Sequence, residues 1–156
     1  ITWDDAVKID WGVIFLYGGG FALGVMSFQT GLAEAVGRGL TELLPLSGGF
    51  GLLVASVFMA VLISETTSNT ASANMVVPVV IAIAQAQGAD PFIPALGATL
   101  GASLGFMLPV STPCNAIVYG SGHIPLMKMV RYGILLDIVG AIVIIAAVWT
   151  LGGFLR

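Results

Sequence analysis

From Trp11 to Phe28 the sequence carries no charged residue, and this charge-free run constrains the fold more than any other feature. A helix of that length rises far enough to cross a hydrocarbon layer about 30 Å thick. The composition extends the point to the whole chain, because 58% of the residues are hydrophobic and only 8% are charged. Soluble domains carry about a quarter charged residues. The sequence therefore predicts an all-α, multi-pass integral membrane protein.

The scarcity of charged residues and of cysteine excludes several function classes. Five Lys and Arg residues and a net charge of -3 provide no basic patch for nucleic acid. Cys114 is the only cysteine, so no intrachain disulfide, zinc site or CxxC pair is available, and we expect no transition metal. No HExxH motif occurs, and we do not expect an enzyme. Because the sequence begins at Ile1 rather than Met and holds only about four or five membrane-crossing elements, we expect a longer parent polypeptide.

The segment after the first apolar run has a different pattern. From Thr30 to Leu44, three charged residues recur every four positions, and apolar side chains fall between them. The charged residues are Glu34, Arg38 and Glu42. This spacing predicts an amphipathic helix that lies along the membrane interface.

The apolar stretch from Gly49 to Gln87 is interrupted in its middle. Its apolar run stops at Ser64 and resumes near Ala71, and the polar sequence SETTSNTASAN joins the two arms. Each arm has about 15 residues and rises about 23 Å, which is short of a full crossing. Two ordinary spans joined by a surface loop are the alternative. The short arms favour a re-entrant helical hairpin whose polar tip lies inside the membrane and lines a site.

A second interruption lies between Asp90 and Gly122. Pro109 and Pro113 each remove a backbone donor and disfavour helix in the residue before them, which predicts a broken transmembrane helix. Thr112 is expected to cap a second half-helix that begins at Pro113 and continues for only about eight residues, to Gly120. Before the break, a row of small residues at four-residue spacing favours close packing against another helix. This row consists of Gly97, Gly101 and Gly105.

A final span is predicted from Ile134 to Leu151 or beyond. Lys128 and Arg131 precede it and place that end on the cytoplasmic side. The fold class is therefore a helical bundle with a re-entrant hairpin and a broken span. Its predicted parts are residues 1–47 (first span and interfacial helix), 48–88 (hairpin), 89–122 (broken span) and 123–156 (final span).

Together the two interruptions predict a binding site near the middle of the membrane. Free backbone carbonyls, Ser and Thr hydroxyls and the Asn69 amide oxygen form the all-oxygen shell that a hard cation such as sodium prefers. Ser68, Asn69 or Thr70 can cap the second hairpin arm, and Thr112 can cap the later half-helix, so two helix N-termini offer free N–H groups to an anion. No Lys or Arg lies between Arg38 and Lys128. An anion held here is therefore bound by amides, hydroxyls and co-bound cations, which predicts cation-coupled anion binding.

The SNT triplet at positions 68–70, followed by LPVSTPCNAIVYGSG, resembles the second half of the divalent anion/sodium symporter family. The stretches WGVIFLYGGGFALG and TGLAEAVGRGL are also similar to that family, so the resemblance covers nearly the whole chain. It implies that this chain is the second of two inverted repeats. It also implies sodium-coupled symport of a small divalent anion across the cell membrane, with succinate, citrate and sulfate left open. An elevator motion, a homodimer and a missing N-terminal half of the same protein are implied as well.

The resemblance also implies the site residues by position. Those for the substrate are Ser68, Asn69, Thr70, Thr112 and Pro113. Those for sodium are Ser64, Ser68, Asn69 and the backbone near Ser111. The sequence departs from the commoner family pattern at Ser111 and Cys114, which leaves the identity of the anion open.

Further polar residues flank the two interruptions. We expect Glu65 to act as a buried or interfacial structural partner, with a sodium or proton role as the alternative. His123 is expected in a surface loop and Cys114 in inert buried packing. Asn115 could form a hydrogen bond across the break and orient the tip, and the sequence leaves open whether it does so.

Two other functions stay open at this point. The same fold could serve as a sodium-independent dicarboxylate exchanger. A membrane scaffold without substrate would use the Gly and Ala rows only for helix packing.

Overall fold

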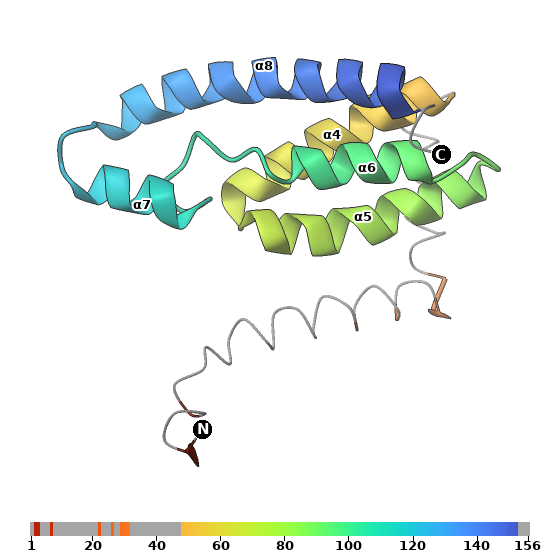
Figure 1. The fold of residues 1–156 in the computed structure, drawn as a ribbon, viewed down its shortest axis with the longest axis horizontal. Helices are drawn as coiled ribbons and strands as arrows, with labels where there is room; N and C mark the ends of the chain where they lie inside the picture. Colours follow the sequence, from red (N-terminus) through yellow and green to blue (C-terminus); the bar gives the residue numbers. More distant parts are fainter. Residues whose placement is uncertain are drawn as a thin grey trace.

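The computed structural model describes residues 48–152 and a few scattered positions before residue 32. The predicted first span and interfacial helix, Trp11–Phe28 and Thr30–Leu44, lie almost entirely outside the described residues. Residues 48–152 contain no strand and form the helices labelled in Figure 1, namely α4 (Gly49–Thr66), α5 (Asn69–Ala86), α6 (Phe92–Gly101), α7 (Pro113–Gly120) and α8 (Leu126–Leu151). This part of the chain is all-helical, as predicted.

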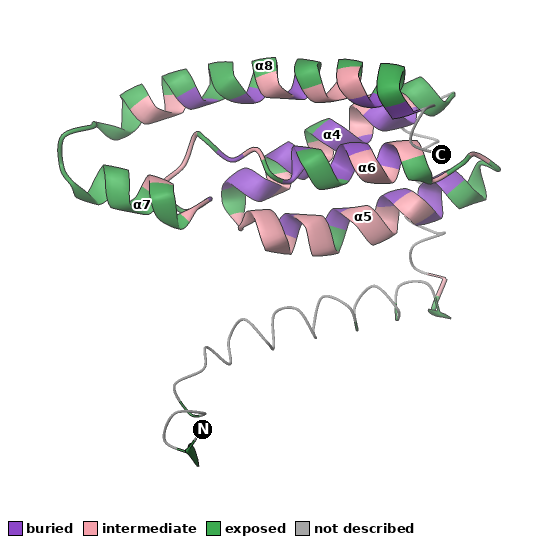
Figure 2. Cartoon of the chain, in the orientation of Figure 1, coloured by how far each residue is buried: buried purple, intermediate pink, exposed green. Residues whose placement is uncertain are grey.

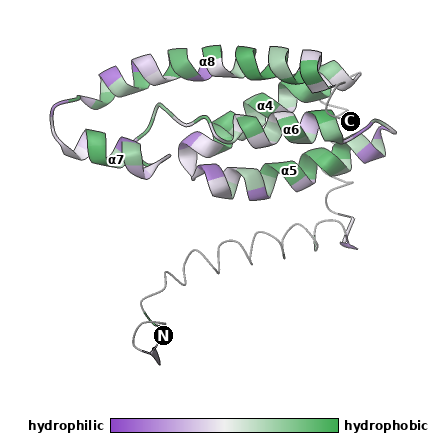
Figure 3. Cartoon of the chain, in the orientation of Figure 1, coloured by the Kyte–Doolittle hydropathy of each residue, from purple (hydrophilic) through white to green (hydrophobic). Residues whose placement is uncertain are grey.

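Three of these helices are long and apolar enough to cross a membrane. The mean hydropathy of their most apolar windows is 1.8 for α4, 1.3 for α5 and 2.6 for α8. Large apolar side chains along the outer face of α8 are exposed, as Figures 2 and 3 show. Ile134, Leu135, Ile138 and Ile142 are among them. Such a continuous apolar face suits contact with lipid or with another membrane segment.

α4 lies at the centre of the described bundle and contacts α5, α6 and α8. On one side Leu53 and Val57 join a buried cluster with Ala141 and Val148 of α8. On another side Ala60 packs with buried apolar residues of α5 and α6. The core is therefore built around one apolar helix that is covered from several directions.

The glycine row packs α6 tightly against α4. A Cβ atom at Gly97 would overlap the Leu53 side chain, and one at Gly101 would lie 2.9 Å from the carbonyl oxygen of Val57. Real Cβ atoms do not approach backbone this closely, so Gly101 must be glycine for the two helices to meet here, whereas at Gly97 the obstacle is the end of the Leu53 side chain. The predicted role of the row in close packing is confirmed for these two positions.

The two arms of the first interruption are longer than predicted. α4 and α5 have 18 residues each rather than about 15, and only Thr67 and Ser68 lie between them. The polar residues continue the helices because their hydroxyls bond to backbone carbonyls. Thr66 donates to the Ile63 oxygen at 3.1 Å, and Ser72 donates to the Ala60 oxygen at 2.7 Å. The expectation of short arms and a long unwound tip was therefore wrong.

The second interruption begins earlier than the prolines predicted. α6 ends at Gly101, where the N–H groups of Ser103 and Leu104 bond three residues back to Leu100 and Gly101, both at 3.0 Å. Such bonds tighten the last turn of a helix and end it. Residues 102–112, which we call the linker, contain no helix. α7 then spans Pro113–Gly120 with Thr112 as its N-cap, as predicted.

α8 begins at Leu126, eight residues before the predicted start at Ile134. Hydropathy detects only the apolar part, whereas the helix starts directly after Pro125 and includes Lys128 and Arg131. Both cations are exposed near the N-terminal end of α8, where long charged side chains reach water. With 26 residues, α8 has a rise of about 39 Å.

α4 and α8 run in opposite directions. Near one end the rings of Phe50 and Trp149 meet edge to face, with centroids 5.0 Å apart. Near the other end of α4, Glu65 faces Asp137, which lies in the first half of α8. From Asp137 back to Leu126, α8 continues for about 18 Å beyond the end of α4. Along the axis of α8, the α4–α5 turn therefore lies level with the middle of the helix rather than with its N-terminal end.

Candidate functional site

Three oxygen atoms meet where the α4–α5 turn touches the linker. The Ser64 hydroxyl oxygen lies 2.8 Å from the Asn69 Oδ1 atom and 2.7 Å from the Ala102 carbonyl oxygen. Both neighbours are acceptors, and a hydroxyl has only one hydrogen to donate. The Asn69 amide donates to the Ser103 carbonyl at 3.3 Å, which directs Oδ1 toward Ser64. These four residues form the tip cluster, and its oxygen atoms suit a hard cation such as sodium.

Gly105 of the linker lies directly against the tip cluster. A Cβ atom at this position would be 3.1 Å from Asn69 Oδ1, 3.4 Å from the Ser64 hydroxyl oxygen and 3.3 Å from Ser111 Cβ. The predicted sodium residues Ser64, Asn69 and Ser111 therefore gather around one glycine, although they come from α4, α5 and the linker.

Glu65 holds the linker in place. Its side chain is 2% exposed, and its Oε1 atom accepts a hydrogen bond from the Met107 N–H at 2.9 Å. Its Oε2 atom accepts from the Leu108 N–H at 3.0 Å and faces the Ser111 hydroxyl at 3.2 Å. A carboxylate with donors on both oxygens is well satisfied in a buried position. The structural role expected for Glu65 is therefore confirmed.

Asn115 bonds across the break from the other side. Its amide donates to the Gly105 carbonyl at 2.8 Å and to the Leu108 carbonyl at 3.0 Å. Backbone carbonyls that a continuous helix would satisfy internally are thus taken by a side chain of α7. The question that the sequence left open for Asn115 is answered, because this residue ties α7 to the linker.

Both interrupted helices start with a hydroxyl cap. The Ser68 oxygen accepts from the Ala71 N–H at 3.2 Å, and the Thr112 oxygen accepts from the Asn115 N–H at 3.1 Å. Through Asn69 and Asn115, each first turn also bonds to a linker carbonyl. The N-terminal ends of α5 and α7, which carry partial positive charge, therefore both lie beside the linker.

The remaining predicted residues lie at the edge of this arrangement. Thr70 is half-buried on the first turn of α5, and Pro113 is exposed at the start of α7. Cys114 is exposed rather than buried, because α7 is an outlying helix without a buried residue. His123 is exposed in the turn before α8, as expected.

Two kinds of polar group near the site were not predicted from the sequence. The first is the backbone oxygens of Ala102 and Ser103, which no side-chain pattern reveals. The second is Asp137, which is 4% exposed, and whose two carboxyl oxygens receive no hydrogen bond. A signal for Asp137 existed, because it is the only carboxylate in the apolar stretch after Asp90.

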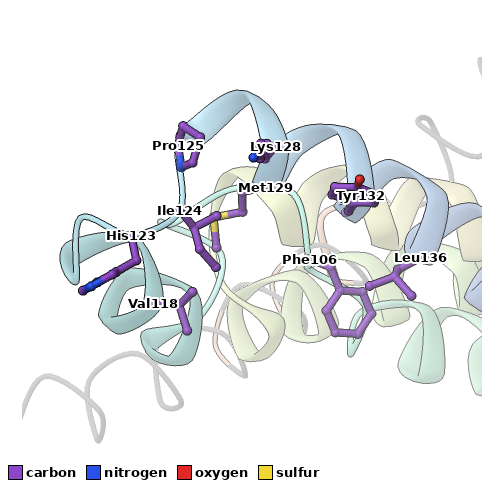
Figure 4. Close-up of a pocket in the computed structure, with 10 residues that line it drawn as sticks. Phe106, Val118, His123, Ile124, Pro125, Lys128, Met129, Tyr132 and Leu136 are labelled. Atoms are coloured by element: carbon purple, nitrogen blue, oxygen red, sulfur yellow. The ribbon is translucent and has the colours of Figure 1, made fainter.

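A separate pocket of about 350 Å³ lies between α7 and the first turns of α8 (Figure 4). Its lining is largely apolar and includes Phe106, Val118, Met129 and Leu136. His123, Lys128 and Tyr132 are its titratable residues. No member of the tip cluster lines this pocket, so it forms no part of the candidate site.

Comparisons with known proteins match nearly the whole length of the chain. Residues 1–155 match the model of the sodium:sulfate symporter transmembrane region. The chain is 36% identical over 151 residues to the sodium-dependent dicarboxylate transporter SdcS of Staphylococcus saprophyticus, covering 97% of this chain and 29% of the relative. It is 37% identical over 149 residues to SdcS of Staphylococcus aureus, covering 96% and 28%. The chain thus spans less than a third of the length of these relatives.

Proposed function

The chain belongs to the sodium:sulfate symporter transmembrane family, and from this premise we propose that its parent protein carries small dicarboxylates such as succinate into the cell together with sodium ions. The family consists of transporters, so the chain is not an enzyme, and it is part of a multi-pass protein of the cell membrane. Both relatives named above are sodium-dependent dicarboxylate transporters by name.

The observation that carries the proposal is the tip cluster. The Ser64 hydroxyl oxygen lies within hydrogen-bond distance of both Asn69 Oδ1 and the Ala102 carbonyl oxygen, with one hydroxyl hydrogen among the three oxygens. One hydroxyl hydrogen cannot serve both acceptors, and a sodium ion between these oxygens would replace the oxygen–oxygen contacts with ion–oxygen contacts. Ser68 and the backbone near Ser111 complete the proposed sodium shell.

The dicarboxylate would bind where the two capped helices begin. The N-terminal ends of α5 and α7 offer partial positive charge beside the linker, and no Lys or Arg lies between Arg38 and Lys128. We assign this role to Ser68, Asn69, Thr70, Thr112 and Pro113. Because the bound sodium would supply the missing positive charge, sodium and anion would each strengthen binding of the other.

The position of the turn supports a re-entrant hairpin and a broken span. α8 extends about 18 Å beyond the level at which α4 ends, so the turn would lie at depth if α8 crosses the membrane. Polar backbone at that depth is tolerated where it lines a cavity. In this proposal residues 48–88 are the hairpin, 89–122 the broken span and 123–156 the final span.

The chain would supply half of the complete site. A first repeat in the missing N-terminal half would provide the other half, and the parent protein would work as a homodimer by an elevator motion. These parts of the proposal rest on the family resemblance of the SNT triplet and the LPVSTPCNA stretch.

The test is uptake of radiolabelled succinate into proteoliposomes that contain the full-length parent protein, with and without a sodium gradient. We expect sodium-driven uptake that Asn69→Ala abolishes. Gln85→Ala is the matched control, because Gln85 is an exposed amide at the far end of α5. Uptake that needs internal dicarboxylate but no sodium would instead indicate an exchanger. No uptake of any tested anion would indicate a scaffold.

A further inference from the structure

Asp137 is a buried carboxyl group that the proposed transport site does not use. Its side chain is 4% exposed, and neither carboxyl oxygen receives a hydrogen bond. An ionised carboxylate without a donor is so costly to bury that such a group takes a proton instead. The orphaned oxygens therefore indicate a bound proton.

Apart from the Phe106 backbone amide of the linker, the surroundings of Asp137 are apolar or carry a second carboxyl group. One turn before it, Gly133 packs against the backbone of Phe106 and Met107, which brings α8 close to the linker. A cavity of about 290 Å³ borders Asp137, and its other lining residues are apolar: Phe58, Val61, Leu62, Met107, Ile134 and Ile138. Water in such a cavity would lack the two to four polar partners that it needs.

Glu65 of α4 is the titratable group that faces Asp137 within residues 48–152. The linker contributes only the Phe106 backbone amide nearby, and the cations Lys128 and Arg131 of α8 are exposed. Glu65 already accepts N–H bonds on both oxygens, so its hydrogen-bonding capacity is better satisfied than that of Asp137. Two facing carboxyl groups in one buried site do not both ionise, and Asp137 is the member without donors.

We propose that Asp137 is a proton-binding site, because its buried oxygens have no hydrogen-bond partner. The bound proton would form a hydrogen bond from α8 to α4 directly beside the linker. Loss of the proton would leave a buried charge without a hydrogen-bond donor at the contact between α8 and the linker and push the two apart. Because the linker also contributes the Ala102 and Ser103 oxygens to the tip cluster, proton loss would disturb that cluster as well.

Infrared spectroscopy of the purified full-length protein in lipid tests proton binding directly. We expect a carbonyl band of a protonated carboxylic acid that moves in heavy water, is lost in Asp137→Asn and remains in the control Asp90→Asn, an exposed carboxyl. The proposal is overturned if the wild type has no such band or if Asp137→Asn retains every band. If Asp137→Asn does not fold, Asp137→Glu replaces it, and an unchanged band position in that variant also overturns the proposal.

The transport consequence rests on the proposed function and has its own readout. Sodium-driven succinate uptake by the wild type should fall as the pH rises through the range in which the infrared band disappears. Relative to its own maximum, uptake by Asp137→Asn should lack this fall. The same alkaline fall in both proteins would overturn the coupling of the proton to transport. Absence of uptake would count against the proposed function alone, because the infrared result does not depend on it.

Discussion

The α4–α5 turn and the linker both interrupt apolar helices, but they are stabilised in different ways. The turn needs only Thr67 and Ser68 and is closed by local bonds, including the Ser68 cap and the Thr67 hydroxyl bond to the Ile63 oxygen at 2.7 Å. The linker, residues 102–112, is held by side chains from other elements, chiefly Glu65 of α4 and Asn115 of α7. A short interruption can thus be encoded locally, whereas a long one depends on residues of other elements.

The largest expected effect comes from removing the partner of the linker. Glu65→Ala would leave the Met107 and Leu108 N–H groups buried without an acceptor. At about 1 to 3 kcal/mol for each group, the full-length protein should lose on the order of 2 to 6 kcal/mol of stability. Thermal or denaturant unfolding in detergent measures this loss.

The matched change in the turn should have a much smaller effect. Thr67→Val removes one hydroxyl, while the Thr67 N–H keeps its own bond to Ile63 at 3.0 Å. We expect a loss of about 1 kcal/mol or less. Equal losses in the two variants would show that the linker is as locally encoded as the turn.

The same contrast explains what could be predicted from the sequence. The start of α7 was predicted because Thr112 and Pro113 act within their own first turn, and the glycine row was predicted because spacing along a helix is local. The end of α6 at Gly101 was not predicted, since the Ala102 and Ser103 carbonyls bond to Ser64 and Asn69. Those partners lie far away in the sequence, and no sequence pattern in the linker indicates them.

The predicted lengths of α4 and α5 were wrong for a related reason. Hydropathy treats Ser64–Asn74 as polar and hence unwound, but hydroxyls that bond to carbonyls remain compatible with a helix. The gathering of Ser64, Asn69 and Ser111 was expected only from family resemblance, because a contact among α4, α5 and the linker is tertiary. Asp137 could have been identified, since a lone carboxylate in an apolar span marks a functional position.

A further prediction concerns how closely the linker approaches the tip cluster. Gly105→Ala would place a methyl group 3.1 Å from Asn69 Oδ1 and 3.4 Å from the Ser64 hydroxyl oxygen. Overpacking of this kind costs about 1 to 3 kcal/mol, so the apparent sodium affinity of succinate uptake should fall about tenfold. Gly120→Ala is the control, because a Cβ atom there meets nothing within 4 Å. Unchanged sodium affinity in Gly105→Ala would separate Gly105 from the cation site.

A similarly small effect is expected at the two hydroxyl caps, which are chemically alike but differ in their surroundings. Ser68→Ala and Thr112→Ala each remove a cap worth about 1 kcal/mol. α5 has buried side chains at Val76 and Val80 that hold it after its cap is lost, whereas α7 has eight residues and none of them is buried. Hydrogen exchange of the full-length protein should therefore accelerate across α7 in Thr112→Ala but only in the first turn of α5 in Ser68→Ala. Equal protection of α7 in both variants would mean that Asn115, through its bonds to the Gly105 and Leu108 carbonyls, fixes the start of this helix without the cap.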